Sequence, residues 1–323
     1  MNINKDKKDL ISFLKKNFKK KHILYNNNNV FEFYYFQKKK FNFILLKEKK
    51  KIKALIGYIL NGKFSKNKIS TLWISLWVSS KNDNISGLKV LSKLENKFSN
   101  YKIACLGLTK EAKKILSALK YNTGELKHYY VLNHKIKKFK IISKPNFDKA
   151  KTNKNIKKIN YKVVNLNNIE KIKTKMFSNE KNKNYIINKY LINKFYKYKV
   201  YNIMVNENSG FILVLRNISI GNSYVGRIID FSGNINLIRY SGYFFQKFLE
   251  TNNLEYIDFC VYGIRHNFMS QGNFILKNEN TTIPNFFEPL IKKNTKLNFA
   301  YKNFKGKFII VKGDGDQERP NRL

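Results

Sequence analysis

The organisation of this chain is decided by two short apolar runs, Ile103-Ala104-Cys105-Leu106-Gly107 and Tyr256-Ile257-Asp258-Phe259-Cys260-Val261. Short apolar runs that end near a glycine are typical of buried strands, and each run follows a segment with helical spacing. Around both runs the same order of elements recurs, with Lys120-Tyr121 in the first half corresponding to Asn273-Phe274 in the second. The sequence therefore predicts an internal repeat.

Periodicity predicts the same kinds of element in both halves. The first half should form helices over 5–20, 85–98 and 109–119, and strands over 30–36, 41–47, 52–60, 71–78, 103–106 and 129–132. The second half should form helices over 167–177, 182–195 and 236–249, and strands over 200–205, 211–215, 224–231, 256–261, 296–301 and 307–312.

Two domains are expected from the length of 323 residues. They cover 1–134 and 161–323, and the lysine-rich stretch 135–160, which contains Pro145 and one possible strand at 139–142, is the linker. The predicted fold class is α+β, in which each domain holds a mixed, mostly antiparallel twisted sheet flanked by helices.

Composition excludes several classes of protein. The chain is 43% hydrophobic and 15% aromatic, which is too apolar for a disordered protein. Its two cysteines lie in apolar runs without a CxxC partner, so no metal site and no disulfide scaffold are expected. We find neither a signal peptide nor a run of roughly 20 apolar residues that could span a membrane. A cytoplasmic location is therefore expected.

The charge is strongly positive, with 64 basic against 21 acidic residues and a net charge of +43. Nearly all of the basic residues are lysines spread over the whole length, and AT-rich codons explain much of this excess. A chain that reads nucleic-acid sequence should favour arginine, so no specific nucleic acid is expected as a partner. The surface should attract polyanions weakly and could favour anionic small substrates.

The C-terminal stretch Lys312-Gly313-Asp314-Gly315-Asp316-Gln317-Glu318-Arg319-Pro320-Asn321 concentrates acids in a basic chain. It follows the apolar run Phe308-Ile309-Ile310-Val311, as loops that face ligands often follow a strand. The alternative is a frayed polar terminus, and the sequence leaves both open. The candidate substrate-binding residues here are Asp314, Asp316 and Arg319.

The order of helix, antiparallel strands, loop, helix, strand, helix and strand resembles the GNAT acyltransferase fold, and its doubling resembles a tandem GNAT protein. In that family a glycine-rich loop before a helix binds the CoA pyrophosphate through backbone N–H groups. The corresponding stretches here, 80–89 and 231–239, match the family pattern only in part, and ordinary N-capped turns are the alternative. The resemblance implies acetyl-CoA or another acyl-CoA as co-substrate. The candidate CoA-binding residues are Asn84, Ser86, Gly87, Lys89, Gly233, Asn234 and Arg239.

The second half is also similar to GNAT-type proteins of bacterial surface-polysaccharide gene clusters. The stretches concerned are Arg227-Ile228-Ile229-Asp230, Tyr256-Ile257-Asp258-Phe259, Ile283-Pro284-Asn285-Phe286-Phe287-Glu288-Pro289 and 314–321. This resemblance implies that an acyl group is transferred from CoA to an amino sugar carried on a nucleotide. Further candidate substrate-binding residues are Arg227, Asn285, Phe287 and Glu288.

GNAT chemistry is the attack of an amine on a thioester, which needs a base, donors for the oxyanion and an acid for the thiolate. These groups should lie where the parallel fourth and fifth strands separate. The candidate catalytic residues are Asp258, His266, Asp230 and Tyr262. Alternatively, Asp258 pairs with an arginine and only holds the fold.

Two other functions stay open at this point. One is a tandem GNAT protein that moves an aminoacyl group from tRNA to a cell-wall precursor, and the other is a non-catalytic binding module. The chain could also form a homo-oligomer.

Overall fold

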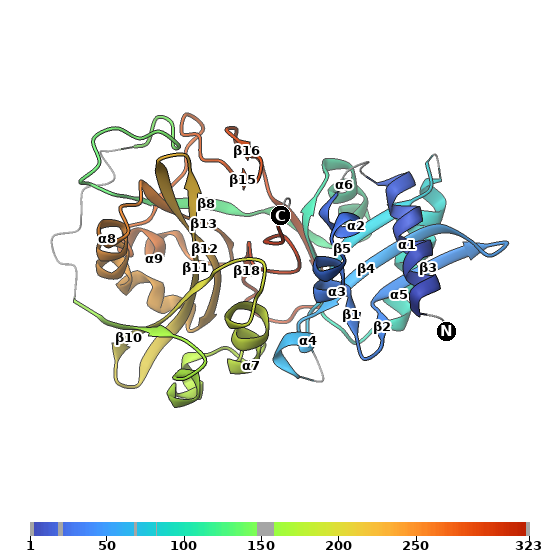
Figure 1. Ribbon diagram of the computed structural model, residues 1–323, viewed down its shortest axis with the longest axis horizontal. Coiled ribbons are helices and arrows are strands. Elements are labelled where there is room, and N and C mark those ends of the chain that lie inside the picture. Colours follow the sequence, from blue (N-terminus) through green and yellow to red (C-terminus); the bar gives the residue numbers. More distant parts are fainter. Residues whose placement is uncertain (1–2, 19–21, 68–69, 82, 147–157, 321–323) are drawn as a thin grey trace.

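The computed structural model describes residues 3–18, 22–67, 70–81, 83–146 and 158–320, which form two lobes around two mixed sheets (Figure 1). The N-terminal lobe has the strand order β3 (Phe43–Glu48), β4 (Lys51–Leu60), β5 (Leu72–Ser79), β6 (Ile103–Leu108), β17 (Asn298–Lys302) and β7 (Asn122–Glu125). The C-terminal lobe has the order β14 (Ile275–Leu276), β8 (Lys127–Leu132), β13 (Tyr256–Tyr262), β12 (Ser223–Gly233), β11 (Ser209–Ile220), β10 (Lys199–Asn206) and β9 (Asn160–Val164).

Most neighbouring strands are antiparallel, whereas β5 and β6, and likewise β12 and β13, pair in parallel. The predicted α+β class, with mostly antiparallel sheets flanked by helices, is confirmed. A further short strand, β18 (Ile310–Val311), pairs with β13, and four more short strands form two hairpins. These hairpins are β1 (Phe36–Gln37) with β2 (Lys40–Phe41), and β15 (Phe286–Phe287) with β16 (Leu290–Ile291).

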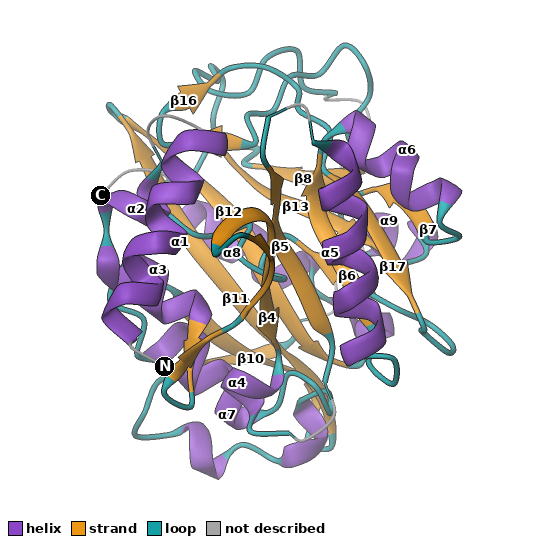
Figure 2. Ribbon diagram, turned by 90° about the vertical axis from the view of Figure 1, so that its right-hand side faces the viewer, coloured by secondary structure: helices purple, strands orange, loops and turns teal. Residues whose placement is uncertain are grey.

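Helices cover the sheets in layers. Figure 2 shows α1 (Ile3–Asn17), α2 (Ile23–Asn26) and α3 (Asn28–Tyr35) on one side of β4 and β5, and α5 (Asn84–Lys97) and α6 (Lys110–Ala118) on the other. In the C-terminal lobe, α8 (Gly242–Thr251) and α9 (His266–Gln271) share a core with the face of the sheet that carries Phe259. The short helices α4 (Gly62–Ser65) and α7 (Lys183–Ile186) are in contact with each other across the lobes.

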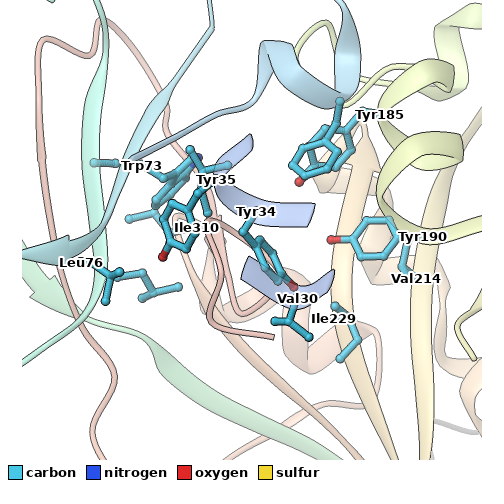
Figure 3. Close-up of a cluster of buried hydrophobic side chains, with 14 of the residues drawn as sticks. Val30, Tyr34, Tyr35, Trp73, Leu76, Tyr185, Tyr190, Val214, Ile229 and Ile310 are labelled. Carbon is cyan, nitrogen blue, oxygen red and sulfur yellow. The ribbon is translucent and has the colours of Figure 1, made fainter. Parts of the chain in front are cut away.

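One apolar core joins the lobes between their inner faces. In Figure 3, Tyr34 of α3 lies between Tyr35 and Trp73 of the N-terminal lobe and Tyr190 and Ile229 of the C-terminal lobe. Ile310, from the C-terminal segment, belongs to the same cluster and is fully buried. Burial of apolar surface stabilises by about 25 cal/mol per Å², so this shared core fixes the lobes against each other.

Each sheet is completed by a strand from the other half of the chain. Strand β8 precedes the second half in sequence but pairs with β13 and β14, and β17 lies near the C-terminus but pairs with β6 and β7. The two lobes therefore exchange one strand each, and neither sheet is formed by a single continuous stretch of chain.

The internal repeat is visible in the way corresponding helices end. Lys120 after α6 and Asn273 after α9 both adopt a left-handed conformation, with φ of 61° and 65°. The next residue, Tyr121 or Phe274, then donates its backbone N–H to the carbonyl five residues earlier. The two cysteines do not correspond, because Cys105 and Cys260 enter cores on different faces of their sheets.

Several sequence-based element predictions are wrong. Residues 30–35 belong to helix α3 instead of a strand, and only Phe36 is in a strand, β1. Asn27 caps the helix at Val30, and the apolar residues lie on one helical face. Residues 139–142 form no strand, although Ile141 and Ile142 are buried. The expected helices at 167–177, 182–195 and 236–249 are broken into shorter pieces. These are the 3-10 turns Ile169–Lys171, Thr174–Met176 and Ile235–Tyr240, the π-helical segment Ile187–Leu191, and helices α7 and α8.

Candidate functional site

Both sheets open at the same place, between the two strands that run in parallel. Strand β5 pairs with β6 only from Leu72 to Ile74, although β5 continues to Ser79 and β6 to Leu108. Strand β12 likewise pairs with β13 only from Gly226 to Ile228. In each case the next residue, Ser75 or Ile229, is the extra residue of a β-bulge against the preceding strand. A bulge bends a strand away from its neighbour, so each sheet contains a wedge at this point.

The wedge of the C-terminal lobe is filled by the C-terminal segment of the chain. Strand β18 pairs with β13 through Val311 and Ile310 on one side, and Gly313 N donates to Ile229 O of β12 at 2.7 Å on the other. A side chain at Gly313 would clash, since an added Cβ would lie 2.6 Å from Ile229 O. The segment therefore fits this wedge only with a glycine at position 313.

Two aspartates and a lysine form a buried cluster beside that segment. Lys181 Nζ lies 2.6 Å from Asp230 Oδ1 and 2.8 Å from Asp314 Oδ1. Tyr185 and Tyr190 donate to Asp230 Oδ2 at 3.1 and 2.5 Å. Burial opposes the charge of Asp230, but Lys181 and Lys189 hold the pKa of its carboxyl below the usual value. Asp230 is thus an anion that anchors the C-terminal segment through Lys181.

Lys189 anchors the same segment through backbone carbonyls. Its Nζ donates to Gly313 O at 2.6 Å, to Gly315 O at 3.4 Å and to the hydroxyl of Tyr185 at 2.9 Å. Burial lowers the pKa of Lys189 to about 8, and the repulsion of Lys181 acts in the same direction. The expectation of a frayed terminus does not hold for the described residues 310–320, which are almost entirely inaccessible to solvent.

In the wedge of the N-terminal lobe, a series of hydrogen bonds begins at the β-bulge. The hydroxyl of Ser75 lies 2.8 Å from the hydroxyl of Tyr35, which donates to Asp316 Oδ2 at 3.1 Å. Burial raises the pKa of Tyr35 well above its usual value, so Tyr35 stays a neutral hydroxyl at physiological pH. Ser75 is half-buried and stands at the point where β5 leaves β6. Within the described residues, no strand lies between β5 and β6 beyond this point.

The last residues of the segment contact the N-terminal lobe. Gln317 lies against Gly107 of β6, where an added Cβ would be 2.4 Å from Gln317 Oε1, and Gly107 has φ of 81°. Arg319 pairs with Asp316 at 2.6 Å and lies 3.2 Å from His22 Nε2. The segment that fills one wedge therefore also presents polar groups to the other.

Glu318 is anchored to the C-terminal lobe. It pairs with Arg216 at 2.9 Å, and the same guanidinium pairs with Glu288, which accepts a hydrogen bond from Tyr196. The Arg216 guanidinium also stacks 3.4 Å from the centre of the Tyr196 ring. Together with the ion pairs of Asp314 and Asp316, this means that every acid of the segment has a cationic partner.

A second buried network surrounds Asp258. Arg227 donates to both carboxylate oxygens at 2.8 and 2.5 Å, and His128 Nε2 lies 2.8 Å from Asp258 Oδ2. Burial disfavours the charge of Asp258, but Arg227 outweighs it and lowers the pKa of the Asp258 carboxyl. Burial also disfavours a charged His128, but Cys260 and Asp258 outweigh it and raise the pKa of His128 to about 9. Arg227 further donates to the carbonyls of Pro284 and Asn285 at 2.8 Å and stacks on Phe287.

His128, Asp258 and Cys260 place three possible metal ligands within 4.8 Å of one another. These groups fit an ion-pair network better than a cation, because the Arg227 fork occupies both oxygens of Asp258 and a cation there would face the buried guanidinium. Lys312 adds further positive charge nearby. Burial and the repulsion of Arg227 lower its pKa to about 8.

The two candidate CoA loops differ. In the N-terminal lobe, α5 follows β5 directly, Asp83 caps it at Ser86 N, and Trp77 Nε1 donates to Gly87 O at 2.9 Å. Lys89 is exposed, and the side chain of Asn84 lies outside the described residues. In the C-terminal lobe, Gly233 is followed by a 3-10 turn that Asn234 caps, and Arg239 packs on the rings of Tyr240 and Phe268.

The four candidate catalytic residues are not brought to one place. Asp258 pairs with Tyr130 across β8, and the neighbouring pair is Phe259 with Tyr129. Successive residues point to opposite faces of a sheet, so His266, whose ring stacks on Tyr129, lies on the other face from Asp258. Asp230 lies in the cluster with Lys181, and Tyr262 is 3.4 Å from the hydroxyl of Tyr301 in the N-terminal lobe.

An open depression of about 460 Å³ lies elsewhere, between Asn67 and the segment 174–184. Its lining is rich in amides, and Asn182 Nδ2 already donates to Ser65 O at 3.0 Å. Asn67 precedes the start of β5, whereas Ser75 lies beyond its parallel part, so this depression does not adjoin the N-terminal wedge.

Sequence reasoning missed Lys181, Lys189, Tyr35 and Ser75. Lysine and tyrosine are so common in this chain that nothing distinguishes a buried pair from an exposed one. The one usable signal was the acidic tail itself, because buried acids need cationic partners.

Comparison with known proteins supports the fold. No protein-family model and no curated protein matches the sequence. Among solved structures, a GCN5-related N-acetyltransferase from Anabaena variabilis is similar over 92% of this chain and 70% of that chain, with a TM-score of 0.53 and 9% identity. This is the GNAT fold.

Two further solved structures are similar at lower TM-scores. An acetyltransferase candidate from Pyrococcus horikoshii has a TM-score of 0.45 at 12% identity, over 93% of this chain and 87% of that chain. A conserved protein of unknown function from Staphylococcus epidermidis has a TM-score of 0.38 at 13% identity, over 80% and 92%. No helix in the described part of the chain has the length and apolar character needed to cross a bilayer.

Proposed function

We propose that this chain transfers an acyl group from acyl-CoA to an amine, and that the wedge of the N-terminal lobe is the reacting site. The observation that supports this choice is the contrast between the lobes. The C-terminal wedge holds β18 and has the apolar Ile229 at its bulge, whereas the N-terminal wedge has the polar Ser75. Beyond Ile74 no described strand pairs with β5 on this side, and backbone groups without a strand partner can hydrogen bond the amides of a pantetheine arm.

The chain offers a path for the proton that the amine loses. An attacking ammonium must be deprotonated before its nitrogen bonds to the thioester carbon, and the C–S bond then breaks to release CoA thiolate, which takes up a proton. In this proposal Ser75 takes the ammonium proton as it gives its own proton to Tyr35, and Tyr35 gives its proton to the Asp316 carboxylate. The same hydrogen bonds then return that proton to the CoA thiolate. Because Tyr35 stays neutral, it relays a proton and does not store charge.

The phosphates of CoA would lie at the start of α5. Lys81 and Lys89 flank that end, and Ser86 and Gly87 supply its first turns. The Asp83 carboxylate competes with an anion there, which makes the two lysines necessary to the fit. As the acceptor we propose an amino sugar carried on a nucleotide, because a net charge of +43 favours anionic substrates.

The test is an assay of CoA release from acetyl-CoA with a panel of nucleotide-linked amino sugars, together with calorimetry of CoA binding. Ser75→Ala should lower turnover by ~10²–10⁴-fold, the contribution of a general acid–base group, and leave the affinity for CoA unchanged. Ser241→Ala is the matched control, because this buried serine bonds one backbone carbonyl in the C-terminal lobe and should leave turnover unchanged.

Absence of both CoA binding and CoA release would favour a non-catalytic module and end the proposal. CoA binding with equal turnover in the wild type and Ser75→Ala would keep the enzyme but remove the relay.

A further inference from the structure

Two tight turns, each made of a pair of lysines, lie before and after edge strand β3 in the sequence. Lys38-Lys39 connects β1 to β2, where Gln37 pairs with Lys40, and Lys49-Lys50 connects β3 to β4, where Glu48 pairs with Lys51. All four lysines have positive φ, of 49°, 62°, 45° and 65°. Positive φ at both central residues is the pattern of a type I′ turn.

Lysine is a poor choice for these positions. Asparagine, aspartate and glycine tolerate the left-handed conformation better than residues with long side chains. Codon bias does not explain the choice, because lysine and asparagine codons are equally AT-rich. Elsewhere in the described residues, this conformation occurs at single positions, at Asn253, Asn273 and Asn303 and also at Lys66, Lys120 and Lys144. Within the described chain, only these two turns place two lysines in succession, so each tip carries a paired positive charge.

The residues around the two turns are mostly basic and expose no large apolar side chain. Residues 38–53 contain one acid, Glu48, and the large apolar side chains in this described stretch are not among the exposed ones. The lysines of the stretch are Lys38, Lys39, Lys40, Lys47, Lys49, Lys50, Lys51 and Lys53. Figure 1 shows the β3–β4 hairpin at the end of the molecule away from the C-terminal lobe.

We propose that this lysine hairpin surface, defined as the lysines between residues 38 and 53, binds the phosphodiester backbone of a nucleic acid without reading its sequence. Lysine ammonium groups act as point charges on phosphates, whereas base recognition favours arginine. Strand β3 spans about 20 Å at roughly 3.4 Å per residue, which is long enough to face several phosphates. A membrane surface is disfavoured because lipid binding gains most from apolar side chains, and the stretch exposes none of the large ones.

Protection of an edge strand is the simpler explanation for lysines on β3. It accounts for lysines along the strand, such as Lys47, but it does not require them at the tips of both turns. Charged tips reach a large partner before the strand does. This difference makes the turn lysines the right residues to test.

The test measures binding of a fluorescent 20-base-pair RNA duplex and of a DNA duplex of the same sequence, by anisotropy over a range of salt concentrations. The variant carries Lys38→Asn, Lys39→Asn, Lys49→Asn and Lys50→Asn, which keep residues suited to the turns. The control carries Lys66→Asn, Lys120→Asn and Lys144→Asn, three exposed lysines in the same conformation elsewhere.

The hairpin variant should bind at least ~10-fold more weakly at low salt, and its slope of log K against log salt should fall by roughly 2–4, as each lost phosphate contact removes about 0.9. The control should change the affinity by about twofold or less. Equal losses in both variants would show diffuse charge attraction and overturn the proposal. Binding to vesicles of phosphatidylglycerol but not to either duplex would overturn it in favour of a membrane.

Discussion

At the residue scale, Asp258 holds the buried charge on which its network depends. Its carboxylate is the counter-charge of Arg227 and His128, all of them in the interior. Asp258→Asn keeps the shape but leaves the guanidinium without its anion, and breaking a buried pair costs about 3–5 kcal/mol. Denaturant unfolding should show a loss of that size.

Asp83→Asn is the matched control for this substitution. Asp83 is a half-buried helix cap, and asparagine caps helices equally well, so the unfolding midpoint of Asp83→Asn should stay at the wild-type value. An Asp258→Asn variant as stable as Asp83→Asn would mean that Arg227 finds another partner.

His128 should make stability depend on pH. In the folded protein, Cys260 and Asp258 outweigh burial and raise the pKa of His128 to about 9, with the cations Arg227 and Lys312 close by. In the unfolded chain, a histidine has a pKa near 6.5. The folded state therefore binds more protons between these values, and the stabilisation is complete below about pH 6.5 and lost as the pH rises to 9.

Denaturant unfolding should show that the wild type is more stable than His128→Gln below pH 6.5, and that this difference in the free energy of unfolding shrinks as the pH rises to 9. His134→Gln, at an exposed histidine, should show no such trend. A gap between wild type and His128→Gln that is constant from pH 6 to 9 would contradict a charged His128.

Some of the site was predictable at this scale. Asp258 within an apolar strand required a partner, and an arginine was among the alternatives that the sequence offered. The partners of the tail were not predictable, because Lys181 and Lys189 resemble every other lysine in the chain. Tyr35 was missed for another reason: its segment was expected to be a strand, which would have pointed it elsewhere.

At the scale of elements, the C-terminal segment acts as a strand and a set of anchors in the C-terminal wedge. Gly313→Ala should displace it, because the new Cβ would meet Ile229 O and the hydroxyl of Tyr190 at 2.6 Å. Overpacking of this kind costs about 1–3 kcal/mol. Chemical denaturation measures the loss directly.

Gly87→Ala provides the comparison. Gly87 lies in a helix, and an added Cβ would be 3.6 Å from its nearest neighbour, Trp77 Nε1, so this variant should be slightly more stable than the wild type. If Gly313→Ala behaves like Gly87→Ala, the segment is not tightly held in the wedge.

Most strands and the helices at 85–98 and 109–119 were correctly expected from periodicity. The failures share a physical cause. Aromatic residues have high strand propensity, so the run Val30-Phe31-Glu32-Phe33-Tyr34-Tyr35 suggested a strand, but a capping asparagine and burial of one face decided for a helix. The broken helices near 170–190 follow the inter-lobe contacts, which local sequence does not specify.

At the scale of the whole molecule, strand exchange should make unfolding a single event. Strand β8 completes the C-terminal sheet and β17 the N-terminal one, so loss of either lobe exposes strand edges in the other. Cys105 is buried in a core of the N-terminal lobe, and Cys260 on β13 is buried in the core that joins the lobes. We expect both thiols to become reactive toward a thiol reagent at the same denaturant concentration.

Variants Cys105→Ala and Cys260→Ala, each keeping one thiol, separate the two signals. Two clearly different midpoints would show that the lobes unfold independently and that the exchanged strands do not couple them. The tandem order was predictable from the repeated pattern, but the exchange was not, because pairing of β8 with β13 depends on how the two lobes dock.

The most direct test of the account is a crystal structure of the chain with acetyl-CoA bound. The account predicts the pantetheine arm between β5 and β6, near Ser75, with β18 still seated between β12 and β13. Acetyl-CoA found between β12 and β13 with the C-terminal segment displaced would contradict it.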